Sequence, residues 1–396
     1  MILDDICILI ADCPHSTAPD EGNGYPLIRT PNIGFGRFSL DGVHRVSEAV
    51  YNERTVRAVP QDNDIILARE APAGNAAIIK NNLKFCLGQR TVLIRPNPKM
   101  VYPDYLVYYL LAPEQQYKLL SKAHGATVAH VNIPDIHSMN VNNLPDLPTQ
   151  RRIASILSAY DDLIENNRRQ IKLLEEAAQR LYREWFVELR FPGHEGVKVM
   201  DGVPEGWTVT TASEVTNVLR RGISPNYDET ARLSVISQKC IRQYMVDMNQ
   251  VRRQSKSFDS SMGLLDSDTV ICSTGTGTLG RVGKVFGNHP NCTFDSHVTL
   301  VRTNGTVGKH YLNLRMYELR EYFDSCKTGS TNQTELSRSI VQNVKVYIAD
   351  SHTQKIFEKI EEAYHQKMMI CQHQIQLLTE TRDRLLPKLM NGEMEV

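Results

Sequence analysis

The sequence of 396 residues repeats itself at an interval of 204 positions. Without a gap, this shift places Thr149-Gln150 on Thr353-Gln354, Leu173-Leu174 on Leu377-Leu378, and Arg180-Leu181 on Arg384-Leu385. The same shift pairs Asp64 with Asp268 in the preceding parts of the two copies. Because self-similarity at a fixed interval is the mark of a fold built from copies, the sequence predicts a tandem duplication. Each copy is a globular part followed by a more similar helix.

The helix that ends each copy carries a heptad pattern. Apolar residues recur at alternating steps of four and three along residues 153–185 and again along residues 357–389, which is the pattern of a coiled-coil seam. The predicted seam contains Leu157, Tyr160, Ile164, Asn167, Ile171, Leu174, Leu181, Tyr364, Ile375, Leu378 and Leu385. Two copies of one helix most simply lie antiparallel about a pseudo-two-fold axis. The alternative is two core helices of one domain.

Polar residues interrupt both seams. Asn167 lies on the first, where a lone polar side chain costs stability but can fix the register. Glu361 and Arg382 lie on the second, and we expect these two to face another subunit. Thr149 and the segment 351–353 are the predicted N-caps of the two helices.

The globular parts combine short β-rich runs with few helices. The runs 64–68, 91–95, 268–272 and 297–302 alternate with loops rich in Gly, Pro and Asn, and helices are predicted near 105–120 and 311–323. The predicted fold class is α/β, with two α/β domains related by tandem duplication and separated by two long antiparallel coiled-coil helices. The predicted division is 1–148, 149–190, 191–350 and 351–396, in the order domain, helix, domain, helix.

Composition narrows the functional classes. The chain carries no uninterrupted apolar stretch long enough to cross a bilayer, and its first residues lack the basic segment of a signal peptide, which predicts a cytoplasmic protein. The eight cysteines form no CxxC pair and read as buried small hydrophobic residues. Net charge is zero overall and −2, 0, +4 and −2 over residues 1–149, 150–189, 190–349 and 350–396. A protein that grips DNA alone usually has a clear basic excess, so either the chain binds no DNA or a partner supplies much of the phosphate grip.

Three patterns that suggest catalysis lack their context. Gly275, Gly277 and Gly280 spell GxGxxG after a strand-like run, but the following residues are too rich in Gly and Pro to form the helix that a dinucleotide site needs. A tight loop between strands is the preferred interpretation. Asp64 and Glu70 lack the Glu-x-Lys of a nuclease metal site, and the segments Asn132–Asp135 and Asn143–Asp146 lack the aromatic residue of an amino-methyltransferase motif. No P-loop is present.

These residues nevertheless match a known family. The run from Leu144 to Leu157, continued by Trp185-Phe186, closely resembles the central repeat of the specificity subunits of type I restriction–modification systems, and the tail Arg384–Gly392 resembles their distal repeat. The first globular part is similar to a known recognition-domain type through the segments 12–17, 28–33 and 65–71. The resemblance covers essentially the whole chain.

The resemblance implies a non-catalytic subunit of a restriction endonuclease and adenine methyltransferase complex. Each globular part would read one half of a split, asymmetric DNA site, while the helices set the spacing and dock two methyltransferase subunits. Restriction and translocase subunits would join them. It also implies no cofactor, metal or catalytic residue in this chain; S-adenosylmethionine, ATP and Mg²⁺ would serve the partner subunits. The near-neutral charge then fits, because the methyltransferases can clamp the duplex.

Base-reading residues should be polar side chains on loops, able to present paired donors and acceptors to base edges. In the first globular part the candidates are Arg29, Thr30, Asn32, Arg69, Glu70, Asn75, Gln89, Arg90 and His130. In the second they are Lys239, Arg242, Thr276, Thr278, Arg281, His297, Asn332 and Gln333. Two other functions stay open at this point: a stand-alone coiled-coil DNA-binding protein, and a methyltransferase in its own right.

Overall fold

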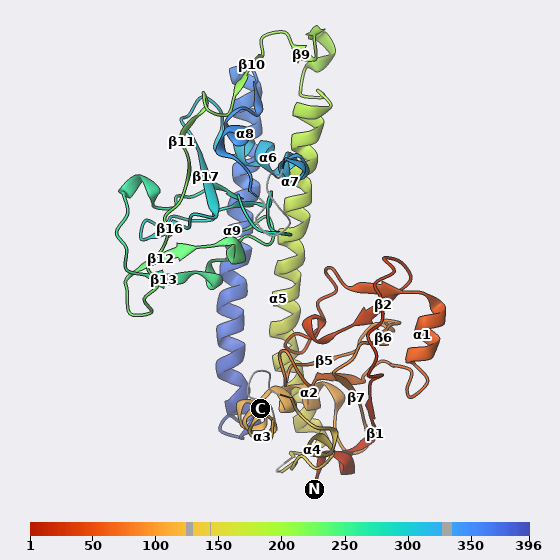
Figure 1. Cartoon of the computed structure of the whole chain (residues 1–396). Coiled ribbons are helices and arrows are strands. Elements are labelled where there is room, and N and C mark those ends of the chain that lie inside the picture. The colour runs from red at the N-terminus through yellow and green to blue at the C-terminus, as the bar shows by residue number, and fades with distance from the viewer. Residues whose placement is uncertain (124–129, 143, 327–334) are drawn as a thin grey trace. The chain divides into compact units, whose positions relative to one another are not determined.

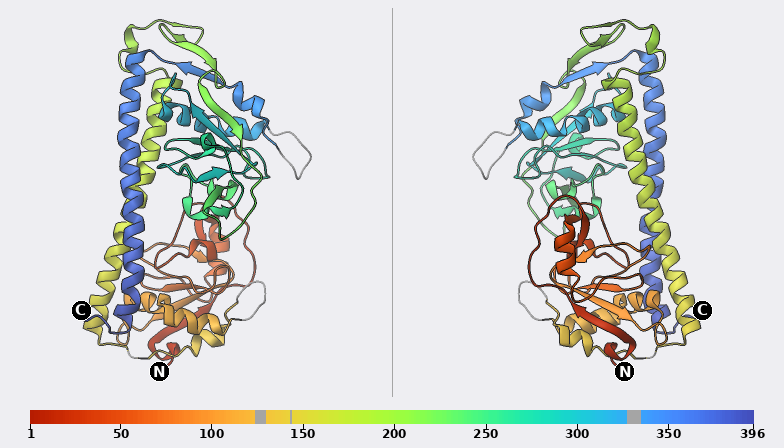
Figure 2. Two further views of the ribbon diagram at one scale, coloured as in Figure 1. Left: turned by 90° about the vertical axis from the view of Figure 1, so that its left-hand side faces the viewer. Right: turned by 90° about the vertical axis from the view of Figure 1, so that its right-hand side faces the viewer.

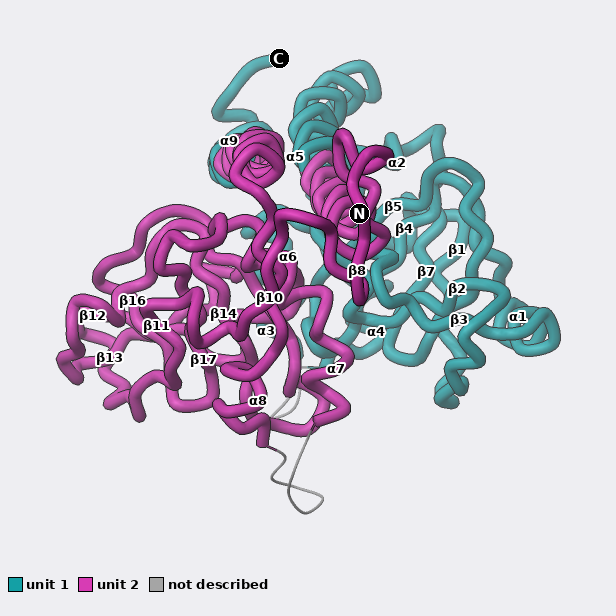
Figure 3. The backbone as a smooth tube through the Cα atoms, turned by 90° about the horizontal axis from the view of Figure 1, so that it is seen from above, with its two compact units in different colours: residues 1–167, 374–396 teal, residues 168–373 magenta. Residues whose placement is uncertain are grey.

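The computed structural model describes residues 1–123, 130–142, 144–326 and 335–396, which form two compact units (Figure 1). Unit 1 contains residues 1–167 and 374–396, and unit 2 contains residues 168–373 (Figure 3). Each unit therefore combines one globular part with a segment of both long helices. None of the described helices is long and apolar enough to cross a membrane.

Unit 1 is built on a four-stranded antiparallel sheet in the order β1-β7-β4-β5. Its strands are β1 (Cys7–Asp12), β7 (Thr91–Pro96), β4 (Ile65–Ala68) and β5 (Ala76–Ile78). A smaller sheet has the order β3-β2-β6, formed by β3 (His44–Val46), β2 (Tyr25–Ile28) and β6 (Cys86–Leu87), with β2 and β6 parallel. The helices are α1 (Glu48–Arg54), α2 (Pro103–Leu111), α3 (Pro113–Ser121) and α4 (Ile133–His137).

Unit 2 repeats both sheets. The larger has the order β11-β17-β14-β15, formed by β11 (Thr216–Arg221), β17 (Val298–Thr303), β14 (Thr269–Cys272) and β15 (Val282–Lys284). The smaller has the order β13-β12-β16, formed by β13 (Arg252–Gln254), β12 (Leu233–Ile236) and β16 (Cys292–Phe294), and β12 is again parallel to β16. Helices α6 (Lys309–Glu318), α7 (Arg320–Ser325) and α8 (Arg338–Gln342) follow. Two further strand pairs are β8 (Val199–Met200) with β9 (Val203–Pro204), and β10 (Thr208–Thr211) with β18 (Lys345–Ile348).

The same ion pair anchors the larger sheet in both units. Asp64 precedes β4 and accepts hydrogen bonds of 2.8 and 2.7 Å from Arg95 Nε and Nη2 on β7. Asp268 precedes β14 and accepts bonds of 2.7 and 2.6 Å from Arg302 on β17. Each carboxylate also accepts a backbone N–H three residues earlier, which closes the turn before the strand. The duplication predicted from sequence is therefore present in both the strand order and the buried polar anchor.

Two long helices run from one unit into the other (Figures 1 and 2). α5 spans Leu147–Tyr182 and continues into a π-helical turn at Arg183–Val187, and α9 spans Ser351–Met390.

The predicted N-caps of these two helices are wrong. Asp146 accepts the Thr149 N–H at 2.9 Å, and Asp350 accepts the His352 and Thr353 N–H groups at 2.9 and 3.0 Å. An aspartate ahead of the helix, at equivalent positions in the two copies, satisfies the free N–H groups that Thr149 or Ser351–Thr353 was expected to satisfy.

Within unit 1, the start of α5 lies antiparallel to the end of α9. Leu157 is fully buried and shares a hydrophobic core with Leu386 and Leu389. Arg382 was expected to face another subunit, but it is 7 % exposed and donates to Asp161 Oδ1 at 2.6 Å. Its guanidinium also lies 4.0 Å from the centre of the Phe35 ring. A buried arginine is tolerated here because its charge has a carboxylate partner inside the same unit.

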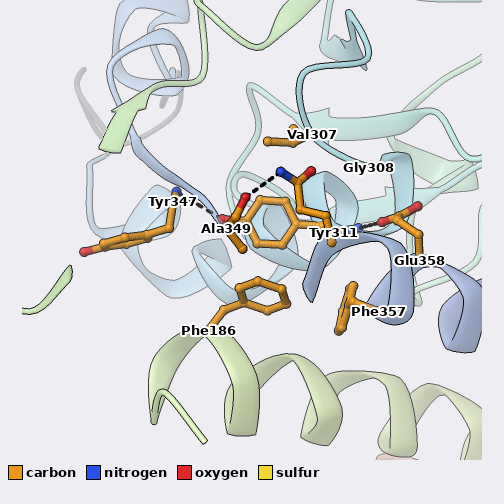
Figure 4. Close-up of a pocket in the computed structure, with 9 residues that line it drawn as sticks. Phe186, Val307, Gly308, Tyr311, Tyr347, Ala349, Phe357 and Glu358 are labelled. Atoms are coloured by element: carbon orange, nitrogen blue, oxygen red, sulfur yellow. Dashed lines mark hydrogen bonds between the residues drawn. The ribbon is translucent and has the colours of Figure 1, made fainter. Parts of the chain in front are cut away.

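Within unit 2, the end of α5 lies antiparallel to the start of α9. The Trp185 and Phe357 rings lie 5.7 Å apart, and the Cys371 thiol lies 3.7 Å from Gln170 Oε1. Phe186, Tyr311 and Phe357 line a small apolar pocket beside Glu358 of α9 (Figure 4). Glu358 accepts the N–H groups of His310 and Tyr311 at 3.3 and 2.8 Å and so caps α6. α9 thus holds the globular part of unit 2 through an aromatic core and a helix cap.

Glu361 was also expected to face another subunit, and this expectation is wrong. Its side chain is 1 % exposed inside unit 2, and Oε1 has no hydrogen-bond partner among the described residues. Burial raises its pKa, and the charge of the buried Lys284 opposes that rise. The sequence pattern placed Glu361 correctly on the seam but could not indicate that Lys284 would come from β15 to face it.

The remaining seam positions are less uniform than a regular coiled coil. Ile164 is buried, whereas Tyr160, Ile171, Leu174, Leu181, Tyr364, Ile375, Leu378 and Leu385 are partly buried. Asn167 is 6 % exposed and donates from Nδ2 to the Leu163 carbonyl of its own helix at 2.9 Å. The predicted single helices near 105–120 and 311–323 are each two helices, because the chain turns before Pro113 and at Leu319.

Candidate nucleic-acid interface

Four predicted base-reading residues of unit 1 gather at one end of the larger sheet. Arg69 and Glu70 follow β4, and Arg90 precedes β7. The Arg69 N–H donates to the Arg90 carbonyl at 2.8 Å, and the Val131 N–H donates to the Arg69 carbonyl at 3.1 Å. The second bond brings His130 beside Glu70. Residues from three separate segments of the chain therefore meet here.

A chain of charged hydrogen bonds fixes these side chains. Arg69 is 7 % exposed and donates to Asp12 Oδ1 at 3.0 Å and to His130 Nε2 at 2.8 Å. Because Nε2 accepts from a guanidinium, the His130 proton lies on Nδ1, which donates to Glu70 Oε1 at 2.5 Å. Glu70 Oε2 lies 2.9 Å from Arg90 Nε. The arrangement presents a carboxylate and, beside it, the half-exposed guanidinium of Arg90.

Such a pair is suited to base edges in the major groove. An arginine fork matches the two acceptors of guanine, and a carboxylate accepts the amino group of cytosine. The Arg90 side chain is 53 % exposed and that of Glu70 is 17 % exposed. Both can meet a base, while the buried Arg69 and the Asp12 carboxylate hold them in place.

The other candidates of unit 1 are used mainly to hold loops. Thr30 donates to the Ala71 carbonyl at 3.2 Å, Asn32 donates to the Ser39 carbonyl at 3.1 Å, and Asn75 donates to the Ile33 carbonyl at 2.9 Å. Gln89 donates to Thr17 Oγ1 at 2.5 Å. Arg29 is half-buried, and its Nε has no partner among the described residues. We therefore expect the partly exposed Arg29 and Gln89 to be better placed for reading bases than Thr30, Asn32 and Asn75.

Unit 2 has the same backbone arrangement with different side chains. The Ser273 N–H donates to the His297 carbonyl at 2.8 Å, and the Leu336 N–H donates to the Ser273 carbonyl at 2.8 Å. Thr274 Oγ1 lies 2.7 Å from His297 Nδ1, and Arg221 Nη1 lies 2.8 Å from Glu335 Oε1. By register, Arg221 takes the place of Asp12, Thr274 of Glu70, His297 of Arg90, and Glu335 of His130. The acidic and basic groups are redistributed around an unchanged frame.

The remaining candidates of unit 2 lie on two loops. Thr276, Thr278 and Arg281 belong to the turn between β14 and β15, where Gly275, Gly277 and Gly280 all have positive φ angles of 95°, 78° and 81°. The preferred interpretation of GxGxxG as a tight loop between strands is confirmed. Lys239 and Arg242 are exposed on the segment after β12. Asn332 and Gln333 lie outside the described residues.

We call the two sets of interacting side chains the reading arrays. They are Asp12, Arg69, Glu70, Arg90 and His130 in unit 1, and Arg221, Gln238, Thr274, His297 and Glu335 in unit 2. Four of these residues were missing from the sequence-based candidates. Asp12 and Arg221 end β1 and β11, Gln238 donates to Thr274 Oγ1 at 2.8 Å, and Glu335 forms the bridge partner of Thr274. β1 and β11 were not predicted as strands, so their ends could not be placed beside the loops. Among the described residues, no group of three or more His, Cys, Asp or Glu side chains is placed to hold a metal ion.

Sequence comparison shows that this chain is similar to specificity subunits of type I restriction enzymes. A family model described as the type I restriction modification DNA specificity domain matches residues 2–176. The type I restriction enzyme MjaIX specificity subunit of Methanocaldococcus jannaschii is 26 % identical over 90 % of this chain and 83 % of its own length. The HindI specificity subunit of Haemophilus influenzae is 22 % identical over 84 % of this chain and 86 % of its own.

A solved structure supports the fold. The crystal structure of the S subunit of a type I restriction–modification system from M. genitalium matches 98 % of this chain and 95 % of its own, with a TM-score of 0.56 and 16 % identity. The predicted fold class is therefore confirmed.

Proposed function

Because the chain belongs to the family of type I restriction–modification specificity subunits, we propose that its two globular parts read the two halves of one split DNA site. The chain is the non-catalytic, DNA-recognising member of its enzyme. The division into reading domains 1–148 and 191–350, joined by helices 149–190 and 351–396, is part of this proposal. None of the comparisons supports the stand-alone DNA-binding protein or the methyltransferase.

The observation that carries the proposal is the pair of arrays at equivalent sheet ends. Glu70, His130 and Arg90 in unit 1 correspond to Thr274, Glu335 and His297 in unit 2. Base pairs differ in the donors and acceptors that they present in the major groove, so readers with different side chains select different bases. The two half-sites should be unrelated in sequence, and the complete site should not be palindromic.

The partners would be double-stranded DNA, two methyltransferase subunits, and restriction and translocase subunits. Leu173 on α5 and Leu377 on α9 are equivalent positions of the duplication and are 55 % and 49 % exposed. An exposed leucine at the same position of both copies favours a partner that binds twice in the same way. S-adenosylmethionine, ATP and Mg²⁺ would be used by these partners, in the cytoplasm.

The test is a map of methylated adenines made with variants of each array. The complex of this chain with its cognate methyltransferase would carry Glu70→Gln or Thr274→Val. We expect Glu70→Gln to change the bases selected in one half-site and Thr274→Val to change the other, with about 1–3 kcal/mol lost on the original bases. A change of both half-sites by one variant, or of neither half-site by both variants, would contradict the proposal.

A second measurement tests dependence on the partner. Because the whole chain has zero net charge, it should bind its site weakly at physiological salt. Adding the methyltransferase should tighten binding by orders of magnitude, since phosphate contacts supply most of the affinity. Tight, specific binding by the isolated chain would favour the stand-alone DNA-binding protein instead.

A further inference from the structure

We propose that Arg45 of unit 1 and Arg253 of unit 2 are phosphate contacts, one in each reader, that grip the DNA backbone without selecting its sequence. The inference rests on the proposed function, because it takes both globular parts to be DNA readers. It adds two residues that are absent from the reading arrays described above, and it assigns them a different task.

The two arginines occupy one position of the duplicated fold. Arg45 lies on β3, directly opposite Pro26 of β2, and Arg253 lies on β13, directly opposite Ser234 of β12. In both units the neighbouring pair, Tyr25 with Val46 and Leu233 with Gln254, continues the same antiparallel register. The partner strand is in turn parallel to β6 or β16. The two side chains are therefore equivalent by strand pairing.

Both guanidinium groups are held in the same manner. Arg45 Nη1 donates to the Gly24 carbonyl at 2.8 Å, just before β2, and Arg253 Nη1 donates to the Ala231 carbonyl at 2.8 Å, just before β12. Each contact uses one of five N–H donors and orients the fork. The backbones are fixed as well, because Asp20 accepts the Arg45 N–H at 3.0 Å and the Arg253 carbonyl accepts the Asp228 N–H at 3.2 Å.

Each arginine holds its charge at the surface. Both residues are exposed, and across the described residues neither guanidinium forms an ion pair with a carboxylate. By contrast, Arg95 and Arg302 are also equivalent in the two units, but each is paired with a buried aspartate. An oriented, exposed guanidinium with free donors is suited to a phosphate, which accepts two parallel hydrogen bonds.

The duplication itself separates phosphate contacts from base readers. A phosphate is the same in every DNA sequence, so a contact with it remains useful in both readers after their specificities diverge. Base readers must differ where the half-sites differ, and the array positions do differ, as Glu70 with Thr274 and Arg90 with His297 show. An exposed arginine retained at one place in two otherwise different readers is therefore assigned to the backbone.

The spacing is compatible with this task. Three residues along β2 separate Pro26, opposite Arg45, from Arg29 at the end where the array lies, and this is about 10 Å of strand. The major groove is about 12 Å wide. The guanidinium, held at the Gly24 carbonyl, lies farther from Arg29 along the strand than Pro26 does, and on this spacing it can reach the phosphates that border the groove rather than the base edges.

The experiment measures binding of the reconstituted complex to a cognate and a non-cognate duplex across a range of salt concentrations. The variants are Arg45→Gln and Arg253→Gln, because glutamine keeps a donor for the backbone carbonyl but loses the charge. We expect each to weaken binding to both duplexes by a similar factor. Each should also reduce the slope of log K against log salt by about 1. The methylated sequence should not change.

Two controls keep the result interpretable. Arg45→Lys retains the charge and should retain the salt slope, even if the strand is slightly destabilised. Lys99→Gln removes a charge beyond the opposite end of β7 and should leave the slope unchanged. An unchanged slope in both glutamine variants, or a loss confined to the cognate duplex, would overturn the inference. If the unmodified complex shows no preference for the cognate duplex, the proposed function itself fails.

Discussion

The two recognition parts share a backbone frame but are joined to the long helices by different chemistry. In unit 1, the position on α5 that faces the globular part is Leu157, and nearby Asp161 accepts from the Tyr108 hydroxyl at 2.6 Å. In unit 2, the equivalent positions on α9 are Glu361 and His365. The joint of unit 1 is an apolar contact flanked by the Tyr108–Asp161 hydrogen bond and an Arg37–Asp162 ion pair of 2.7 Å, whereas the joint of unit 2 is a network of buried charged groups.

The network of unit 2 is built around Lys284. This lysine is 1 % exposed and donates to His310 Nδ1 at 2.7 Å, and His310 Nε2 donates to Glu362 at 2.9 Å. By strand pairing its counterpart in unit 1 is the buried Ile78, because Ile78 lies opposite Ile65 as Lys284 lies opposite Thr269. The duplication thus preserved strands and anchors while the buried faces diverged. Backbone geometry constrains strand pairing, but many side-chain combinations can fill the same interface.

The largest expected effect concerns the buried Asp161–Arg382 ion pair, which links α5 to α9 within unit 1. Arg382→Ala leaves Asp161 buried without its cation, which should cost about 3–5 kcal/mol of unfolding free energy. Arg384→Ala, two residues further along α9, removes an exposed side chain and should change stability by less than about 0.5 kcal/mol. Denaturant unfolding of the two variants measures the difference. Equal stability of the two would mean that Asp161 and Arg382 do not form a buried pair.

Lys284 and Lys80 should differ when each is replaced by methionine, because Lys284 is 1 % exposed whereas Lys80 is 33 % exposed and pairs with Asp104 at 2.8 Å. Lys284→Met leaves Glu361 buried without a counter-charge and should cost about 2–4 kcal/mol, whereas Lys80→Met removes a half-exposed pair worth about 1 kcal/mol or less. Adding Glu361→Leu, the residue type found at position 157, should restore most of the stability lost in Lys284→Met. If the double variant is no more stable than Lys284→Met, the two charges do not act on one another.

The pH dependence of unit 2 gives a smaller effect of defined sign. Burial raises the pKa of Glu361 above its usual value of 4.5, to about 7. The stability that this carboxyl contributes is therefore present below pH 4.5 and is lost as pH rises towards 7. Relative to Glu361→Gln, the unmodified chain should become less stable over this range.

Glu362→Gln provides the matched control for that measurement. Although burial opposes it, hydrogen bonds from Gln366, His310 and Lys309 hold the pKa of Glu362 at about 2. Its contribution is present above pH 4.5 and is lost as pH falls towards 2, which is the opposite direction. Parallel pH profiles for the two variants would contradict the assignment of a raised pKa to Glu361.

The frame was accessible from sequence because local patterns specify it. The runs 64–68 and 268–272 became β4 and β14 with a shift of one residue at the start, and the heptad stripes became α5 and α9. Asp64 and Asp268 were recognised as equivalent positions, but their arginine partners lie on another strand. Pairing between strands distant in sequence leaves no periodic signal, so the ion pairs were visible only in the fold.

The reading array of unit 1 could be predicted only in part, because its contacts also join segments that are distant in sequence. Arg69, Glu70, Arg90 and His130 were chosen as polar loop residues, and the structure brings them together. The same criterion selected Thr30, Asn32 and Asn75, whose polar groups bond to the backbone. A sequence identifies side chains capable of hydrogen bonding, but it does not say whether the backbone already occupies them. Glu361 and Arg382 were misassigned because their partners lie on elements distant in sequence.

The smallest expected effect concerns the two helix caps, where the halves should behave alike. Asp350→Ala removes the acceptor for the N–H groups of His352 and Thr353 and should cost about 1 kcal/mol. Although burial opposes it, hydrogen bonds from Thr353 lower the pKa of Asp350 below 3.8. In the first copy, hydrogen bonds from the equivalent Thr149 lower the pKa of Asp146 in the same way. The stabilisation is thus present above pH 3.8 and is lost as pH falls through the lowered pKa. Asp146→Ala should destabilise in the same direction, and both variants should approach the unmodified chain in stability under acid. If only one aspartate behaves in this way, the N-caps of α5 and α9 have diverged between the two copies, as the contacts between globular part and helix have.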